Sequence, residues 1–261
     1  MLFNQKFDLI FSIGEDCACS SYLRRYNLQD YSYPFDWLTK ATFKTRLDLL
    51  LNDFQGFLEK ENLIPMEKPN NKNVDFENDY YKDTKYDFYF YHDFKTGKSF
   101  EESFNDVKEK YNRRISRLYK NIESSNNMLL LWWSRDKHQE EDLLKEYYDK
   151  LVKKYPNKNI YLLILEYSKN YKEKFLSDGH IKVVQYDNIS YMHNPKWTEV
   201  MGNEKNNKKV FSQIKKYRTL DWYLNFAIYK FVNCLIGLII IKDLRKKLRK
   251  DWQYHCLKAK L

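Results

Sequence analysis

Cys17 is the residue whose type and position in this 261-residue chain best suit nucleophilic chemistry. It follows an apolar run at residues 7–13 and a short polar loop at residues 14–16, and a helix is expected from Ser20 to Tyr26. Open α/β sheets hold reactive groups where a buried strand ends in a glycine-containing turn before a helix. A thiol near a helix N-terminus is also activated, because the partial positive charge there favours the thiolate. The sequence therefore predicts a cysteine nucleophile in a strand-to-helix turn.

Apolar segments of strand length alternate with helical segments along residues 7–190. Further strands are expected at 86–91, 128–133, 160–165 and 181–184, and helices at 42–51, 99–122, 138–155 and 170–176. The stretch Ser99-Phe100-Glu101-Glu102 is a capping box that begins the second of these helices. Strands that are apolar on both faces and alternate with helices predict an α/β fold, with a parallel, Rossmann-like sheet flanked by helices. Residues 59–84 are polar and are expected to form a long surface excursion.

Polar residues follow the predicted strands, and the carboxyl ends of parallel strands share one crevice. On this basis the sheet brings Cys17 together with His92 and Asp93, with Ser134 and Arg135, and with Glu166. An imidazole there can take the thiol proton, and a carboxylate can orient the imidazole. The remaining site residues expected to contact substrate are Gly14, Glu15, Asp16, Trp37, Arg135 and Glu166.

Each of these residues also has a structural interpretation. Cys17 can be a small buried residue, and His92 can simply end a strand. Asp36 can cap a helix at Leu38 instead of taking part in catalysis. Arg135 can pair with Asp136 or Glu166 instead of a ligand, since an unpaired buried charge is costly. His193 is a reserve candidate for the base.

The formal net charge of +10 suggests an anionic partner, and much of it lies in the last twenty residues. The chain contains no P-loop, G-x-G-x-x-G, G-x-S-x-G or H-E-x-x-H motif and no recognisable nucleic-acid-reading module. Its four cysteines fit neither a disulfide framework nor a zinc site, so we expect no metal and no cofactor. The N-terminus does not read as a secretory signal, and we expect a cytoplasmic protein.

The C-terminal part differs in character, and we expect two units: an α/β domain at 1–200 and a helical, basic segment at 210–261. Residues 217–249 predict one long helix or two joined helices. Their apolar core at 231–241 is too short to span a bilayer. One interpretation is a helix packed on the sheet. The other is peripheral contact with the inner face of the membrane, because a basic segment directly follows the apolar one.

The opening of the chain resembles the DUF1796 family, which is described as papain-like cysteine peptidases. The resemblance rests on Ser-Ile-Gly-Glu-Asp-Cys at 12–17, Tyr-Leu-Arg at 22–24 and Pro-Phe-Asp-Trp-Leu at 34–38. It continues at residues 90–94 and 111–118 and in the strand ending at Arg135, covers roughly 7–190, and fades beyond. The resemblance implies Cys17 as nucleophile and His92 as base, with Asp36 and Asp93 both open as the third member.

The leading prediction is therefore a cysteine-dependent hydrolase or transferase acting on a small-molecule, peptide or glycan substrate. Backbone N–H groups of residues 14–19 would form its oxyanion hole. Papain-like enzymes usually carry the histidine on antiparallel strands, so a parallel sheet leaves room for acyl or glycosyl-ester transfer. One alternative is an envelope polysaccharide enzyme at the membrane face. Another is a non-catalytic module that binds an anionic ligand through Arg135, Arg113 and Arg114.

Overall fold

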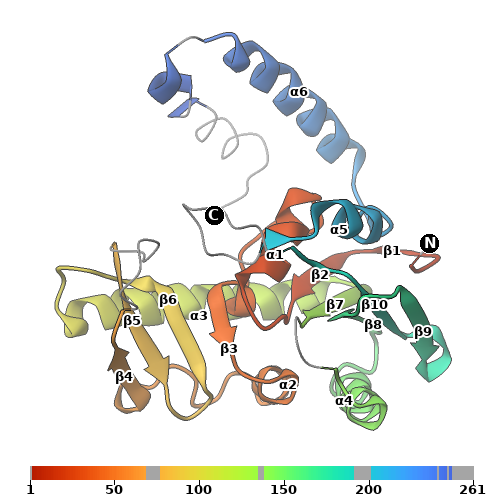
Figure 1. Ribbon diagram of the computed structural model, residues 1–261, viewed down its shortest axis with the longest axis horizontal. Helices are drawn as coiled ribbons and strands as arrows, with labels where there is room; N and C mark the ends of the chain where they lie inside the picture. Colours follow the sequence, from red (N-terminus) through yellow and green to blue (C-terminus); the bar gives the residue numbers. More distant parts are fainter. Residues whose placement is uncertain are drawn as a thin grey trace.

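The computed structural model describes residues 2–68, 77–134, 138–190, 201–239, 241–245 and 247–248, with the backbone alone at 189, 190, 201 and 202. Its larger sheet has five strands in the order β2-β7-β8-β10-β9 (Figure 1). These strands are β2 (Leu9–Ser12), β7 (Asn127–Trp133), β8 (Asn159–Tyr167), β10 (Ile181–Tyr186) and β9 (Lys172–Leu176). The first four are parallel, and β9 pairs antiparallel with β10. The prediction of an α/β protein with a parallel sheet between helices is confirmed at this level.

The predicted helix at 170–176 is wrong, because this segment forms the edge strand β9. Most of its side chains are exposed, since β9 pairs with a neighbour on one side only. A short polar edge strand carries no apolar pattern that distinguishes it from a surface helix.

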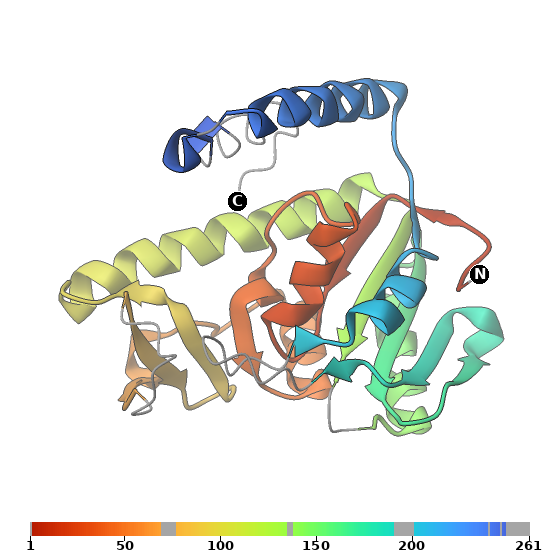
Figure 2. The same ribbon diagram turned by 45° about the horizontal axis from the view of Figure 1, so that its top comes forward.

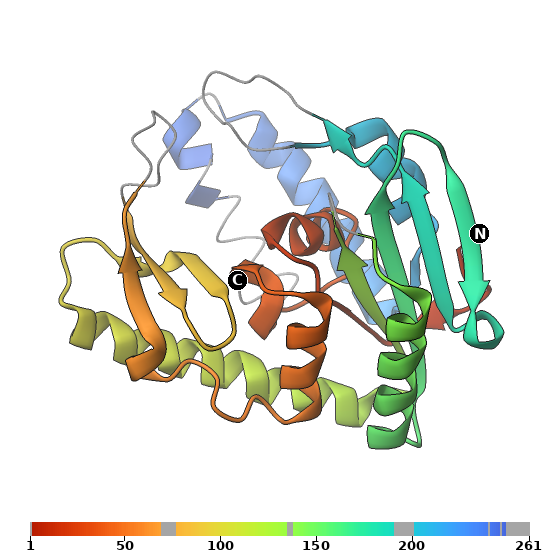
Figure 3. The same ribbon diagram turned by 60° about the horizontal axis from the view of Figure 1, so that its bottom comes forward.

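Helices cover both faces of the larger sheet. On one face α1 (Cys17–Arg25) and α5 (Glu204–Phe211) pack against β7 through Leu23 and Phe211 (Figure 2). On the other face lie α2 (Phe43–Leu51), α3 (Phe100–Ser124) and α4 (Glu141–Lys154), which are in front in Figure 3. Thr42 caps α2, and the predicted capping box of Ser99 and Glu102 begins α3. These caps explain why the beginnings of both helices could be read from the sequence.

A second, antiparallel sheet stands beside the first, in the order β3-β6-β5-β4 (Figure 1). Its strands are β3 (Leu38–Lys40), β6 (Phe88–Lys95), β5 (Asn78–Asp83) and β4 (Leu63–Met66). It packs on α3, where the rings of Phe90 and Tyr111 lie 5.8 Å apart. The prediction that the 86–91 segment belongs to the parallel sheet is wrong, because it pairs with β3 and β5 instead. His92 and Asp93 therefore do not lie at the carboxyl edge of the parallel sheet.

The predicted surface excursion at 59–84 is also wrong where it contains β4 and β5; residues 69–76 within it lie outside the described part of the chain. The remaining elements are short. They are β1 (Lys6–Phe7) paired with β13 (Lys215–Lys216), β11 (Ile189–Ser190) paired with β12 (Met201–Gly202), and the 3-10 helices η1 (Pro34–Trp37), η2 (Lys60–Asn62) and η3 (Ser177–Gly179).

The last long helix, α6 (Leu220–Gly237), is the outermost element of the molecule, beyond α1 and α5 (Figures 1 and 2). Ile236 is its buried residue, and its other side chains are half-buried or exposed. The interpretation that this segment packs on the sheet is therefore wrong. Among the helices of the described ranges, none is both long enough and apolar enough to cross a bilayer.

Candidate active site

Cys17 is the first residue of α1, three positions earlier than the sequence predicted for this helix. The helix begins there because Asp16 is its N-cap, with Oδ1 accepting a hydrogen bond from the Ala18 N–H at 2.8 Å. Aspartate is among the favoured N-cap residues, so this start was available in the sequence. Cys17 is half-buried, and as the first helical residue it lies where the helix dipole favours a thiolate.

Cys19 differs from Cys17 in its burial. Its side chain is fully buried against β7, with Sγ 3.5 Å from the Leu131 carbonyl oxygen, and burial raises the pKa of its thiol. A Cβ added to Gly14 would lie 2.6 Å from the Cys19 Cβ, so α1 packs directly on the Gly14 loop. Glycine at position 14 therefore has a structural role, and of the two thiols Cys17 is the accessible one.

A buried arginine, Arg46 on α2, binds the backbone of η1 and β3. Its guanidinium donates to the carbonyl oxygens of Leu38 and Lys40, both at 2.9 Å. Burial lowers the pKa of Arg46 to about 10, while the charges of Asp16 and Glu15 oppose that lowering. The arginine thus provides positive charge that offsets Glu15 and Asp16, the two acidic residues that precede Cys17. Nothing in the helical pattern of residues 42–51 marked Arg46 as buried, and sequence reasoning missed it.

Glu15 and Glu166 lie at the carboxyl edge of the parallel sheet, as predicted. The Ser134 hydroxyl donates to Glu15 Oε2 at 3.2 Å and so connects the ends of β2 and β7. Glu166 is buried, and its Oε2 lies 2.8 Å from His138 Nδ1. It also accepts from the Gln139 backbone N–H at 2.7 Å and from Gln185 Nε2 at 3.0 Å. The predicted substrate residue Arg135 and the reserve candidate His193 lie outside the described residues.

His138 is the candidate that sequence reasoning passed over. Its side chain is 59% exposed, so the imidazole is accessible while the carboxylate behind it is buried. The available indications were an acid at the end of β8 and a histidine just after β7, two adjacent parallel strands. Their pairing joins side chains 28 positions apart in the sequence, which no local pattern predicts.

Asp36 is buried in η1 and is engaged by three donors at Oδ2. These are Arg24 Nη1 at 3.2 Å, Gln29 Nε2 at 2.5 Å and the Tyr33 N–H at 3.0 Å. Burial raises the pKa of the Asp36 carboxyl to about 6, and the Arg24 charge offsets only part of that effect. This carboxylate therefore holds η1 against α1. The predicted cap of a helix at Leu38 is wrong, because Leu38 begins strand β3.

His92 is exposed on β6 and reaches α1 through Trp37. The centres of the Trp37 and His92 rings lie 5.7 Å apart in an edge-on arrangement. The Arg24 guanidinium lies 5.1 Å from the centre of the Trp37 ring. Asp93 instead points into the protein, where it binds Lys110 Nζ at 2.5 Å and accepts from the Tyr111 hydroxyl at 3.0 Å. Both predicted orienting carboxylates thus have structural partners of their own.

The Ser20 hydroxyl links α1 to η1. Its Oγ lies 3.1 Å from the Cys17 carbonyl oxygen and 3.0 Å from the Asp36 carbonyl oxygen. The contacts place η1 along α1, with Asp36 and Trp37 against Arg24 in its last turn, while Cys17 lies in its first turn. His92 contacts Trp37 from the antiparallel sheet, and Glu166 with His138 lies along the parallel sheet edge.

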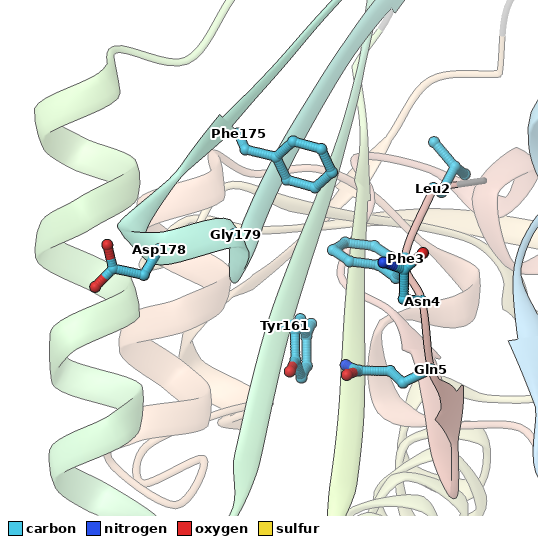
Figure 4. A pocket seen from close by; sticks show the side chains of 8 residues that line it. All are labelled: Leu2, Phe3, Asn4, Gln5, Tyr161, Phe175, Asp178 and Gly179. Carbon is cyan, nitrogen blue, oxygen red and sulfur yellow. The ribbon is translucent and has the colours of Figure 1, made fainter.

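A cavity of about 470 Å³ lies at the opposite end of the larger sheet (Figure 4). It is lined by Phe3, by Tyr161 near the beginning of β8, and by Phe175 and Gly179 next to β10. This is the amino end of the parallel strands, whereas Cys17 follows the carboxyl end of β2, so the cavity is separate from Cys17. Within the part of the chain that the structure describes, no cluster of three or more histidine, cysteine or acidic side chains is arranged to hold a metal.

The larger sheet thus places a cysteine at the start of the helix that follows its first strand, β2. The model of the family described as "Putative papain-like cysteine peptidase (DUF1796)" matches residues 8–170, more than half of the chain. The chain therefore belongs to the DUF1796 family, and the resemblance found in the sequence is confirmed. The family description supports the coarse assignment to peptidases or hydrolases.

One curated relative is a viral protein of undetermined function. The chain is 26% identical over 156 residues to "Uncharacterized protein R408" from Acanthamoeba polyphaga mimivirus, covering 55% of this chain and 68% of the viral protein. No solved structure matches the chain significantly.

Proposed function

We propose that this protein is a cysteine-dependent hydrolase of papain-like mechanism with Cys17 as its nucleophile. The observation that carries the proposal is the position of Cys17 at the first residue of α1, half-buried and next to a buried, inert Cys19. The sulfur attacks the substrate carbonyl carbon while its proton passes to a histidine, which then protonates the leaving group. Water hydrolyses the resulting thioester and regenerates the thiol.

The first turn of α1 supplies the donors for an oxyanion hole. Backbone N–H groups at the start of a helix have no intrahelical acceptor, and their dipoles favour negative charge. Asp16 occupies one of them, the Ala18 N–H. The others in this turn form the oxyanion hole in our proposal.

Two histidines are candidates for the base. His92 is the one that the family resemblance implies, and its contact with Trp37 brings it toward α1. His138 is held by a buried carboxylate in the imidazole–carboxylate arrangement of catalytic triads. Because Asp36 and Asp93 are occupied elsewhere, we propose His138 with Glu166 as the pair to test against His92.

The test compares single substitutions in a hydrolysis assay with a panel of fluorogenic peptides and esters. Cys17→Ala should abolish turnover, and Cys234→Ser, which changes an exposed thiol on α6, should leave it unchanged. Replacing the histidine that acts as the base with alanine should lower kcat by about 10²-fold or more. If that histidine is His138, Glu166→Gln should reproduce most of the loss. Full activity of the Cys17→Ala protein would refute the proposal.

The envelope polysaccharide enzyme and the anionic-ligand-binding module stay predictions. The cytoplasmic location and the division of the chain into two units at residues 200–210 stay predictions as well. Of the arginines invoked for anionic-ligand binding, Arg113 is paired with Glu109 and Arg114 lies over the Tyr111 ring. Those contacts favour structural roles for both side chains. The hydrolase is therefore the function that the described residues support best.

A further inference from the structure

An exposed apolar stripe runs the length of α6. Its members repeat at intervals of three and four residues, which places them on one side of the helix. Each is 49–77% exposed, and the stripe consists of Leu220, Tyr223, Leu224, Ile228, Phe231, Leu235 and Leu238. Contiguous exposed apolar surfaces of this kind mark an interaction site.

The opposite side of α6 carries further apolar residues. Trp222 and Phe226 stack on each other with ring centres 4.8 Å apart, and Ile236 is buried. A wide apolar face of a helix is normally covered by another surface. On α6 only the side opposite the stripe is partly covered, so the stripe needs an external partner to be covered.

The chain that follows combines apolar and basic residues. Ile241, Leu244 and Leu248 are exposed and alternate with the exposed Lys242 and Lys247. Residues 242–250 contain six lysines and arginines against one aspartate. A surface that matches both features must offer negative charge beside an apolar interior, which is the chemistry of an anionic lipid bilayer. A second copy of this chain would cover the stripe but would leave the basic residues without counter-charge.

We propose that α6 with residues 241–245 and 247–248 binds the surface of an anionic bilayer, with the stripe facing the acyl chains. The helix is about 27 Å long and forms the outer edge of the molecule in Figures 1 and 2, so it can lie in the membrane plane. In that orientation Lys242 and Lys247 meet lipid phosphates. This inference is independent of the proposed hydrolase function, because it uses none of Cys17, His92, His138 and Glu166.

Flotation of the full chain with vesicles tests the proposal. Binding should be strong to phosphatidylcholine mixed with phosphatidylglycerol and weaker to phosphatidylcholine alone, and it should fall as salt is raised. Phe231→Glu and Leu224→Glu should each weaken binding about tenfold or more. The matched control is Ile64→Glu, which changes an exposed apolar residue on β4 and should leave binding unchanged. Lys242→Glu combined with Lys247→Glu should remove the preference for phosphatidylglycerol.

Thermal unfolding of the same variants separates binding from folding. Phe231 and Leu224 are 66% and 55% exposed, so their replacement should leave the melting temperature unchanged. Absence of vesicle binding by the folded chain would overturn the proposal, as would binding that survives Phe231→Glu. A dimer in analytical ultracentrifugation that Phe231→Glu dissociates, without vesicle binding, would assign the stripe to a second copy and would also overturn it.

Discussion

Replacing the buried Asp36 carboxylate with an amide should change how stability depends on pH. Burial raises the pKa of Asp36 from 3.8 to about 6 in the folded protein, so the folded state binds this proton more tightly than the unfolded state. The free energy of unfolding therefore falls as pH rises from about 4 to about 6. At about 1.36 kcal/mol per tenfold change in proton affinity, the ionised carboxylate costs the fold about 3 kcal/mol above pH 7.

Asp36→Asn removes that titration and keeps an acceptor for Arg24, Gln29 and the Tyr33 N–H. Urea unfolding of both proteins between pH 4.5 and 7.5 should show wild-type stability falling by about 2 kcal/mol relative to the variant. Most of the change should occur below pH 6.5. At pH 7.5 the variant should be at least as stable as wild type, because the Asp36 pKa stays raised to about 6 even with Arg24 beside the carboxylate.

The matched control is Asp48→Asn. Asp48 has a lowered pKa because Lys44 and Tyr147 donate to it, so its titration lies below the tested range. The difference between wild type and Asp48→Asn should therefore be constant from pH 4.5 to 7.5. The stability difference between wild type and Asp36→Asn could instead be constant as well, or the wild type could gain relative stability with rising pH. Either result would contradict the claim that burial raises the pKa of Asp36.

Two further substitutions test the packing around the site. Gly14→Ala should destabilise the protein by about 1–3 kcal/mol, because the new Cβ would lie 2.6 Å from the Cys19 Cβ; an unchanged urea midpoint would refute the close packing of α1 on this loop. Ser99→Ala should cost about 1 kcal/mol in the same assay, since Ser99 Oγ caps the Glu102 N–H of α3, whereas Ser124→Ala at the other end of that helix should cost less.

The elements of the larger sheet were largely predictable, because β7 and β8 are buried on both faces and read as continuous apolar runs. Helices with a recognisable cap, such as the Ser99 capping box of α3, were equally clear. The apolar pattern of β6 identified a strand but not its partners. Its pairing with β3 and β5 is set by tertiary contacts, so the sequence placed His92 in the wrong sheet.

The candidate site was predictable where function rests on local chain geometry. Cys17 was found because a strand, a glycine turn and a helix follow one another in sequence. The Glu166–His138 pair and the burial of Arg46 were missed, since each depends on contacts between segments that local periodicity does not relate. Edge strand β9 was missed for a related reason, as its polar residues carry no burial pattern.

The central claim is that Cys17 is activated by its position at the start of α1. Peptide-resolved alkylation with iodoacetamide across pH 5.5–8.5 tests it directly, with the exposed Cys234 as an internal reference. If exposure alone governed reactivity, Cys234 would react first, because Cys17 is half-buried. We predict that Cys17 reacts about tenfold or more faster than Cys234 at the acidic end of this range, as expected for a thiolate favoured by the helix N-terminus. Slower alkylation of Cys17 than of Cys234 at every pH would contradict its assignment as the nucleophile.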